Sequence, residues 1–288
     1  MGNGAERCSQ GAAALCLGAM TPETLLTHID TGTLWPGAPG GDSASDQAAA
    51  YQQALAVRAL RIARGEVPAG YKIGFTNRTI WPRYGVFAPI WGTVWDTTVT
   101  HCPEQDAGEG SLDLTHTCQP RLEPEAVFGM AATPPADATI DQLFASIEWI
   151  APGFEIVQSH LADWKFRAAD TMLDSGLHAR LLVGRKRPLR EVAANAVEFD
   201  AKFGACRVRL LEGEVQRDEG KGANVLDSPL RALHHFLAEL RACPGADDLK
   251  KGDIITTGTW TDAWPVKPGQ TWTAAFEAPM WPLTVRFA

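Results

Sequence analysis

The stretch Arg121-Leu-Glu-Pro-Glu-Ala-Val-Phe128 decides how the rest of the chain is interpreted. Its apolar residues predict a strand, and in extended backbone successive side chains point to opposite faces. Glu123 and Glu125 therefore share one face, while apolar residues such as Leu122 and Phe128 occupy the other. Burying two like charges side by side raises a pKa strongly or requires a cation. The pair is the first indication of a metal site.

A third carboxylate, Glu155, has a similar apolar setting in Pro152-Gly-Phe-Glu-Ile-Val157. Three carboxylates with no Cys or His among them favour Mg²⁺, Mn²⁺ or Ca²⁺ over zinc or copper. They also leave about half of an octahedral shell for water or substrate. The alternative is that Glu123 and Glu125 lie on a solvated edge strand, of which Pro124 is typical.

Lys72 is the candidate catalytic residue, in the predicted strand segment Gly70-Tyr-Lys-Ile-Gly-Phe-Thr76. Strand alternation places Lys72, Gly74 and Thr76 on one face, where a ligand can approach the glycine backbone closely. A partly buried lysine near a metal has a lowered pKa and moves protons near neutral pH. The alternative is a surface lysine on an exposed strand face.

Two further segments carry polar groups that could serve such a site. The apolar strand Gly252-Asp-Ile-Ile-Thr-Thr-Gly-Thr259 ends in hydroxyls and a glycine, and we expect Thr257, Gly258 and Thr259 to offer donors to a substrate carboxylate. Among the histidines, we place only His178 near the site. Many strands end in hydroxyl residues, so this segment has little weight by itself.

Composition excludes several classes of protein. The chain has 288 residues, 45% of them hydrophobic and 21% charged, as in a soluble globular protein with a core. Its net charge of −8 argues against nucleic acid or an anionic membrane as partner. No apolar stretch is long enough to span a membrane. The six cysteines show no metal-finger spacing, which favours reduced thiols and a cytoplasmic protein.

The chain divides into three parts. We expect residues 1–19 to be a disordered upstream extension, with Met20 as the natural start. Residues 20–68 form a small helical N-terminal region: one helix over 22–31, capped by Thr21 and ended by Gly32, and one from 45 or 46 to 64. Residues 69–288 form a β-rich catalytic domain.

The pattern of the third part predicts short strands interrupted by two helices. Strands are expected over 71–75, 122–130, 154–158, 181–183, 198–203, 207–211, 253–257, 271–276 and 283–287, and helices over 141–150 and 229–242. The fold class is therefore α+β, a helical N-terminal region followed by a large mixed β-structure with packed helices.

Four segments together resemble the fumarylacetoacetate hydrolase superfamily, in its 2-keto-4-pentenoate hydratase and 4-oxalocrotonate decarboxylase branch. The resemblance covers roughly residues 20–288, and it rests on Tyr71–Thr76, Arg121–Glu125, Pro152–Val157 with Asp170-Thr171, and Gly252–Gly258. It implies a mixed β-roll like the C-terminal domain of that superfamily, assembled as homodimers or larger homo-oligomers. It also implies Mg²⁺ or Mn²⁺ held by Glu123, Glu125 and Glu155, with Lys72 as the active-site lysine.

The same resemblance implies a hydratase that adds water to a short 2-hydroxydienoate or 2-oxo-enoate, such as 2-keto-4-pentenoate, in the catabolism of aromatic-derived acids. Such an acid chelates the metal through its C1 carboxylate and C2 oxygen, and Lys72 acts as general acid and base. A decarboxylase or a C–C bond hydrolase at the same site is the alternative. A third hypothesis is an oxo-acid binder without turnover.

Two positions depart from the family pattern. Many hydratases have an aspartate where this chain has Ile90, which cannot move a proton. Many also have Asn-Ala-Ser-Ser where this chain reads Asp174-Ser-Gly-Leu-His-Ala179. His178 and Asp96 are the candidates to replace the lost polar function. These departures bear on the reaction and the substrate rather than on the metal site.

Overall fold

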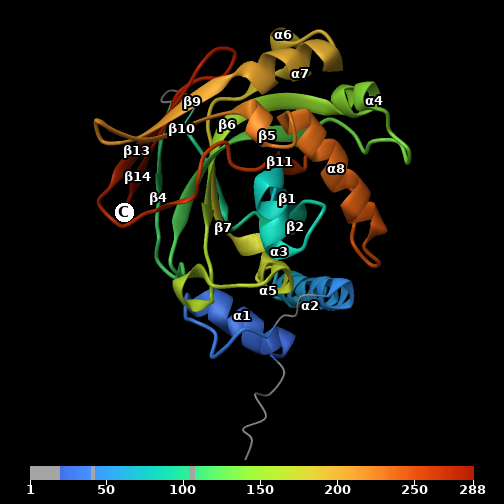
Figure 1. Ribbon diagram of the computed structural model, residues 1–288, viewed down its shortest axis with the longest axis vertical. Coiled ribbons are helices and arrows are strands. Elements are labelled where there is room, and N and C mark those ends of the chain that lie inside the picture. The colour runs from blue at the N-terminus through green and yellow to red at the C-terminus, as the bar shows by residue number, and fades with distance from the viewer. Residues whose placement is uncertain (1–19, 40–42, 104–107) are drawn as a thin grey trace, which may run out of the picture.

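The computed structural model describes residues 20–39, 43–103 and 108–288, so the predictions for residues 1–19 lie outside the described residues (Figure 1). Helices α1 (Pro22–Thr31) and α2 (Ala44–Ala63) lie together at one end of the molecule. Thr21 caps α1 by accepting a hydrogen bond from the amide of Thr24, and Gly32 ends it with a φ of 62°. Both predicted N-terminal helices are confirmed.

A nine-stranded sheet forms the centre of the fold. Its main path runs β2-β1-β11-β5-β6-β7-β3, with β12 added to β5 and β8 to β6. The strands are β1 (Pro68–Gly74), β2 (Ile90–Trp95), β3 (Val99–His101), β5 (Arg121–Met130), β6 (Ile147–Val157), β7 (His178–Val183), β8 (Arg187–Pro188), β11 (Ile254–Thr256) and β12 (Trp264–Pro265). The β1–β11 and β3–β7 pairs are parallel, and the others are antiparallel.

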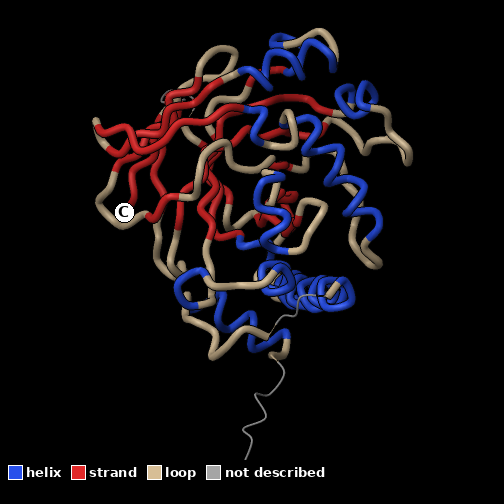
Figure 2. The backbone as a smooth tube through the Cα atoms, in the orientation of Figure 1, coloured by secondary structure: helices blue, strands red, loops and turns tan. Residues whose placement is uncertain are grey.

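A second sheet of five strands has the order β10-β9-β13-β14-β4. It contains β4 (Glu109–Leu112), β9 (Arg207–Glu212), β10 (Val215–Lys221), β13 (Thr271–Phe276) and β14 (Leu283–Phe287). Only its β14–β4 pair is parallel. Figure 2 shows the strands gathered on one side of the molecule, with most helices at its two ends and along the opposite side. The α+β class predicted from the sequence is confirmed.

The remaining helices are short apart from α8. They are α3 (Trp81–Tyr84), α4 (Ile140–Ala145), α5 (Ala168–Leu173), α6 (Leu189–Val192), α7 (Ala196–Ala205) and α8 (Pro229–Ala242), with 3₁₀ turns at Arg78–Ile80, Ala162–Trp164, Ser175–Leu177 and Gly222–Asn224. Ser228 caps α8 by accepting from the amide of Arg231. The predicted apolar stripe of α8 is buried: Leu230, Leu233, Phe236, Leu237 and Leu240. No helix in the described residues is long and apolar enough to cross a membrane.

Strand alternation in β5 separates the main core from the site. Leu122, Ala126 and Phe128 are fully buried in the large hydrophobic core, together with Phe199 and Phe236 from α7 and α8. The opposite face of the same sheet carries the glutamates and then a smaller apolar cluster: Val94, Val127, Ala151, Leu181, Val183 and Ile254. The period of two in the sequence therefore assigns the two faces correctly.

Two predictions of secondary structure are wrong. Residues 198–203, expected as a strand, lie in helix α7, because Asn195 caps that helix by accepting from the amide of Glu198. The helix expected over 141–150 ends at Ala145, and Ile147 begins strand β6. Ile147 pairs with Met130 in the neighbouring strand. That pairing is non-local and overrides a pattern of apolar residues that fits a helix and a strand equally well.

Candidate metal centre

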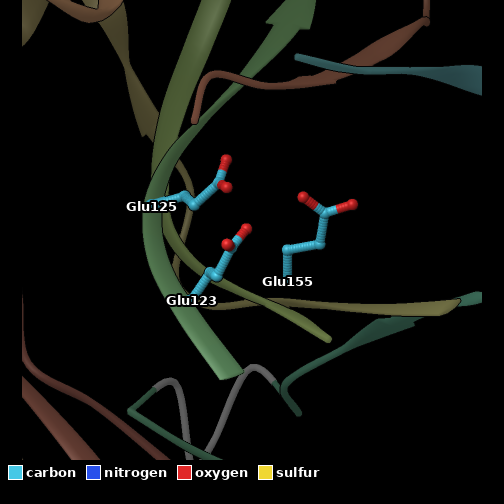
Figure 3. Close-up of side chains that lie close together, drawn as sticks. All are labelled: Glu123, Glu125 and Glu155. Carbon is cyan, nitrogen blue, oxygen red and sulfur yellow. The ribbon is translucent and has the colours of Figure 1, made fainter. Parts of the chain in front are cut away.

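The register of two neighbouring strands brings the three glutamates together. Glu123 on β5 lies directly across from Glu155 on β6, and Glu125 follows on the same face of β5. One carboxylate oxygen from each lies within 4.8 Å of the others (Figure 3). Strand β5 lies between β11 and β6, so the alternative of a solvated edge strand is wrong. The predicted carboxylate cluster is confirmed in its geometry.

The neighbouring strand β11 and the residues just after it hold the Glu125 carboxylate in place. The side chain is fully buried, and its Oε2 accepts hydrogen bonds from the amide of Gly258, at 2.7 Å, and from the Thr256 hydroxyl. Its other oxygen, Oε1, has no hydrogen-bond partner among the described residues. A buried carboxylate oxygen without a donor is costly, and a bound cation satisfies it. The Glu125 carboxylate therefore fits a metal ligand.

The segment 252–259 contacts the Glu125 carboxylate partly through the backbone amide of Gly258. Gly258 has a φ of 100°, and a Cβ there would lie 2.1 Å from Oγ1 of Thr76, so only glycine fits. The Thr257 hydroxyl donates to the carbonyl of Ala126 at 2.8 Å, and the Thr259 hydroxyl donates to that of Thr261 at 2.9 Å. Thr76 and Thr259 line the cavity beside the glutamates. The donors of Thr257 and Gly258 are directed to protein acceptors.

Lys72 reaches the same cluster from strand β1. Its Nζ lies 3.0 Å from Oε2 of Glu155, and both side chains are buried. Burial by itself lowers the pKa of Lys72, but the negative charges of Glu155, Glu123 and Glu125 outweigh this and raise it above its ordinary value. The expected lowering of the Lys72 pKa is therefore wrong for the site without a bound cation. Lys72 is an ammonium group at neutral pH.

The three carboxyl groups differ in their readiness to ionise. Burial and the charge of Glu155 raise the pKa of Glu123 to about 7, against the opposing effect of Lys72. Burial, Glu155 and Glu123 raise the pKa of Glu125 well above its ordinary value. Burial acts in the same direction on Glu155, but Lys72 and His178 outweigh it and lower its pKa. Two of the carboxyls thus hold protons that a cation must displace.

The two candidates to replace an acid at position 90 lie elsewhere. Ile90 is buried in the cavity wall. Asp96 is exposed in the turn after β2, where its Oδ1 accepts from the amides of Val67 and Thr97. His178 is buried behind Glu155, with its Nδ1 2.9 Å from Oε1 of that residue. The Asp96 carboxylate therefore contacts backbone amides of a turn instead of replacing an acid at position 90, and His178 contacts the Glu155 carboxylate.

Lys72 and Glu123 line a cavity of about 490 Å³. Its walls include an aromatic series in which Phe75 stacks on Tyr84, and Tyr84 on Phe166. Arg83 and Arg121 also line it, and the Arg121 guanidinium stacks on Trp164 at 4.2 Å. The cavity is of the size that small-molecule sites occupy.

Several lining residues were not predicted from the sequence. Arg121 could have been, because it shares its strand face with Glu123 and Glu125 two and four residues later. Tyr84 and Phe166 had no such signal, since they lie on different segments, α3 and the loop before α5. The close approach of Gly176, where a Cβ would lie 2.9 Å from Cδ of Lys72, also depends on tertiary contact.

Known proteins resemble this chain in sequence over most of its length. No protein-family model matches the chain. A 4-oxalocrotonate decarboxylase of Pseudomonas sp. is 30% identical over 242 residues, which cover 83% of this chain and 86% of the relative. A 2-keto-4-pentenoate hydratase of Burkholderia vietnamiensis is 27% identical over 238 residues, covering 82% of this chain and 83% of the relative.

A solved structure shares the fold. The 4-oxalocrotonate decarboxylase from Pseudomonas putida G7, complexed with magnesium and adipate, has a TM-score of 0.75 and 24% identity, covering 93% of this chain and 97% of that chain. Similarity in sequence and similarity in fold thus both extend over most of the chain. The chain belongs to the 2-keto-4-pentenoate hydratase and 4-oxalocrotonate decarboxylase branch of the fumarylacetoacetate hydrolase superfamily.

Proposed function

We propose that this protein is a divalent-metal-dependent hydro-lyase that adds water to a short 2-hydroxydienoate or 2-oxo-enoate such as 2-keto-4-pentenoate. The observation that carries the proposal is the cluster of Glu123, Glu125 and Glu155 around buried Lys72, beside a cavity of about 490 Å³. The match to a relative named 2-keto-4-pentenoate hydratase covers most of the chain. The degradation of aromatic-derived acids is the metabolic setting that the family membership supports.

The three glutamates are the residues that would hold Mg²⁺ or Mn²⁺. Their oxygens match the preference of both ions for hard ligands, and Oε1 of Glu125 has no hydrogen-bond partner among the described residues. The related decarboxylase structure that contains magnesium supports this choice. When bound, such an ion supplies Lewis-acid stabilisation of the negative charge that develops on the oxygens of a 2-oxo acid.

Lys72 is the residue that would move protons. Its Nζ lies 3.0 Å from Oε2 of Glu155, and the residue lines the cavity, so the ammonium can donate to a substrate oxygen or carbon that enters beside the carboxylates. Before a cation binds, the neighbouring negative charges raise the pKa of Lys72 and keep its amine protonated. The lysine can therefore act first as acid.

The rest of the wall would orient the substrate and exclude water. Thr76 lines the cavity and has a hydroxyl that could donate to a carboxylate, whereas the Thr259 hydroxyl donates to the carbonyl of Thr261. Ile90 and the stacked rings of Phe75 and Tyr84 offer only apolar contact. A short conjugated chain with one polar end fits such a surface, since its carbon atoms face the rings while its oxygens face the glutamates.

Decarboxylation of a 2-oxo acid is the second candidate, favoured by a specific observation. Ile90 lines the cavity wall and cannot itself accept a proton from water. Arg121 lines the cavity, where its guanidinium stacks on the ring of Trp164. It is a suitable partner for a second carboxylate. The decarboxylase among the relatives supports this candidate.

One experiment separates these functions. Purified protein, treated with chelator and then supplied with Mg²⁺ or Mn²⁺, is incubated with 2-hydroxypenta-2,4-dienoate or with an unsaturated 2-oxo dicarboxylic acid. We expect metal-dependent loss of dienoate absorbance without release of CO₂. CO₂ release from the dicarboxylic acid alone identifies the decarboxylase. Binding of either acid without turnover identifies a non-catalytic binder and refutes both enzymatic proposals.

We also propose a cytoplasmic homodimer or larger homo-oligomer. Exposed apolar side chains support assembly: Phe87 is 80% exposed and Val197 75% exposed. The described cysteines, Cys102, Cys118, Cys206 and Cys243, are free thiols, as is usual in a reducing compartment. Light scattering after size-exclusion chromatography tests the first statement, and a single 31.1 kDa species refutes it.

A further inference from the structure

Two buried polar residues lie behind Glu155, on the side away from Lys72. Nδ1 of His178 is 2.9 Å from Oε1 of Glu155, and Nε2 of the same ring is 2.9 Å from Oγ1 of Thr98. On the other side, Nζ of Lys72 is 3.0 Å from Oε2. The two oxygens of one carboxylate therefore have different partners, with His178 on Oε1 and Lys72 on Oε2.

The position of His178 results from an irregularity in the sheet. Glu155 pairs with Leu181 and Ile156 with Arg180, but Val157 then pairs with His178 instead of residue 179. This bulge inserts one extra residue into β7. In a regular pair, residue 178 would face the opposite side of the sheet from Glu155. The bulge therefore turns the imidazole toward the carboxylate, as bulges near functional sites often re-aim a side chain.

Hydrogen-bond chemistry fixes the direction of the contact between His178 and Glu155. A carboxylate only accepts, so Nδ1 of His178 must carry a hydrogen, and in the neutral ring Nε2 then accepts. The Thr98 hydroxyl has two acceptors within reach, Nε2 of His178 at 2.9 Å and the carbonyl of Trp95 at 3.1 Å. That carbonyl also accepts from the amide of Thr98 at 2.9 Å. The Trp95 amide in turn donates to Oγ1 of Thr98 at 3.1 Å.

All three side chains are shielded from solvent. Glu155 is 0% exposed, His178 6% and Thr98 7%, so water does not replace a missing donor without rearrangement. A buried acceptor that loses its donor is destabilised, and this penalty holds the carboxylate in one orientation. Outer partners of this kind orient metal ligands and affect metal affinity about 10- to 100-fold when removed.

We propose that Thr98 and His178 are positioning residues that hold Oε1 of Glu155, so that Oε2 alone is presented to the divalent cation and to Lys72. The proposal rests on the proposed metal-dependent function. It gives a physical role to the departure of residues 174–179 from the family pattern, because His178 lies within that segment. Glu155 then binds the cation through one oxygen while His178 keeps the other in place.

The test measures binding of Mn²⁺ alone, by electron paramagnetic resonance of the free ion and by calorimetry, without substrate. His178→Ala removes the donor to Glu155. His178→Asn keeps an N–H near the position of Nδ1 and is the matched control. Thr98→Val removes the hydroxyl at nearly constant volume, and Thr98→Ser restores it. Circular dichroism and thermal unfolding show that each variant is folded at the temperature of the titration.

We expect His178→Ala to weaken Mn²⁺ binding by about 10- to 100-fold, and His178→Asn to recover it to within about threefold of the unchanged protein. Thr98→Val is expected to weaken binding by about threefold or more, with Thr98→Ser close to the unchanged protein. If His178→Ala does not fold, the Thr98 pair decides the result. Equal Mn²⁺ affinity in the folded Ala or Val variants overturns the positioning role.

The two levels of inference fail in different ways. If the unchanged protein binds no Mn²⁺, the metal centre and the proposed function are wrong, and the positioning role with them. If the unchanged protein binds Mn²⁺ and weakened binding in His178→Ala is not recovered in His178→Asn, the imidazole is a packing residue. Only loss with Ala and recovery with Asn supports an N–H donor to Glu155.

Discussion

Lowering the pH from 8 to 6 should weaken Mg²⁺ or Mn²⁺ binding by about tenfold or more. The pKa of Glu123 is raised to about 7, because the carboxyl is desolvated and lies across from Glu155. A cation must displace the proton of Glu123. The factor by which this protonation weakens metal binding therefore rises from about 1.1 at pH 8 to about 11 at pH 6. Glu125, whose pKa is also raised, makes the dependence steeper.

Calorimetry in two buffers with different ionisation enthalpies measures both the affinity and the protons released. At pH 7, Glu123 contributes about half a proton to each binding event, and Glu125 adds to it. The Glu123→Gln variant is the control: it should bind more weakly but with a shallower pH dependence. An affinity that is constant within about twofold between pH 6 and pH 8, with no proton release, refutes the reasoning from buried carboxyl groups.

The same group also links pH to stability, and the sign can be stated. The unfolded chain loses this proton near its ordinary pKa of 4.5, whereas the folded chain keeps it up to about 7. The contribution to folding is therefore fully present below pH 4.5 and is lost as the pH rises through 7. It amounts to about 3 kcal/mol for this group. Thermal unfolding should accordingly show stronger stabilisation by Mg²⁺ at pH 8 than at pH 6.

Three substitutions give further expected outcomes. Lys72→Met should lower kcat by about 10²- to 10⁴-fold in the dienoate assay, because it removes the proton donor. Calorimetry should show undiminished metal affinity, because the substitution also removes a competing positive charge, and near-normal turnover contradicts the acid and base role. Gly258→Ala should lower the free energy of unfolding by about 2 kcal/mol or more in denaturant titration, since its Cβ meets Thr76 and its φ is strained; unchanged stability contradicts the close approach. Ile90→Asp should raise the ratio of water addition to CO₂ release, measured by dienoate absorbance and CO₂ detection. Ile90→Asn, which has the shape of aspartate without its titratable proton, should leave the ratio unchanged, and equal ratios in the two variants contradict the explanation from position 90.

Strand periodicity carried most of what could be predicted about the glutamates. Glu123 and Glu125 share a face because backbone geometry repeats every two residues, and this holds for any strand that forms. The same alternation placed Leu122 and Phe128 in the core. Helix α1 was predictable for a similarly local reason, since the Thr21 cap and Gly32 act on adjacent backbone groups.

Predictions failed where one local pattern fits two structures. The apolar residues from Leu143 to Ile150 suit a helix, but pairing with β5 draws Ile147 and Ile150 into a strand. Asn195 is a strong cap, yet the residues after it were assigned to a strand from their apolar content. Asp96 looked available as an acid, but the backbone amides of a turn occupy its carboxylate.

The sequence by itself determined that two carboxylates share a strand face, that a lysine and a third carboxylate have similar apolar settings, and which family carries these segments. Only the tertiary structure decided that Glu123 lies across from Glu155, that β11 holds Glu125, and that a bulge turns His178 onto Glu155. The physical reason is one of range. Alternation and capping act within a few residues of the chain, whereas strand register, burial and the resulting pKa shifts arise between segments brought together by folding.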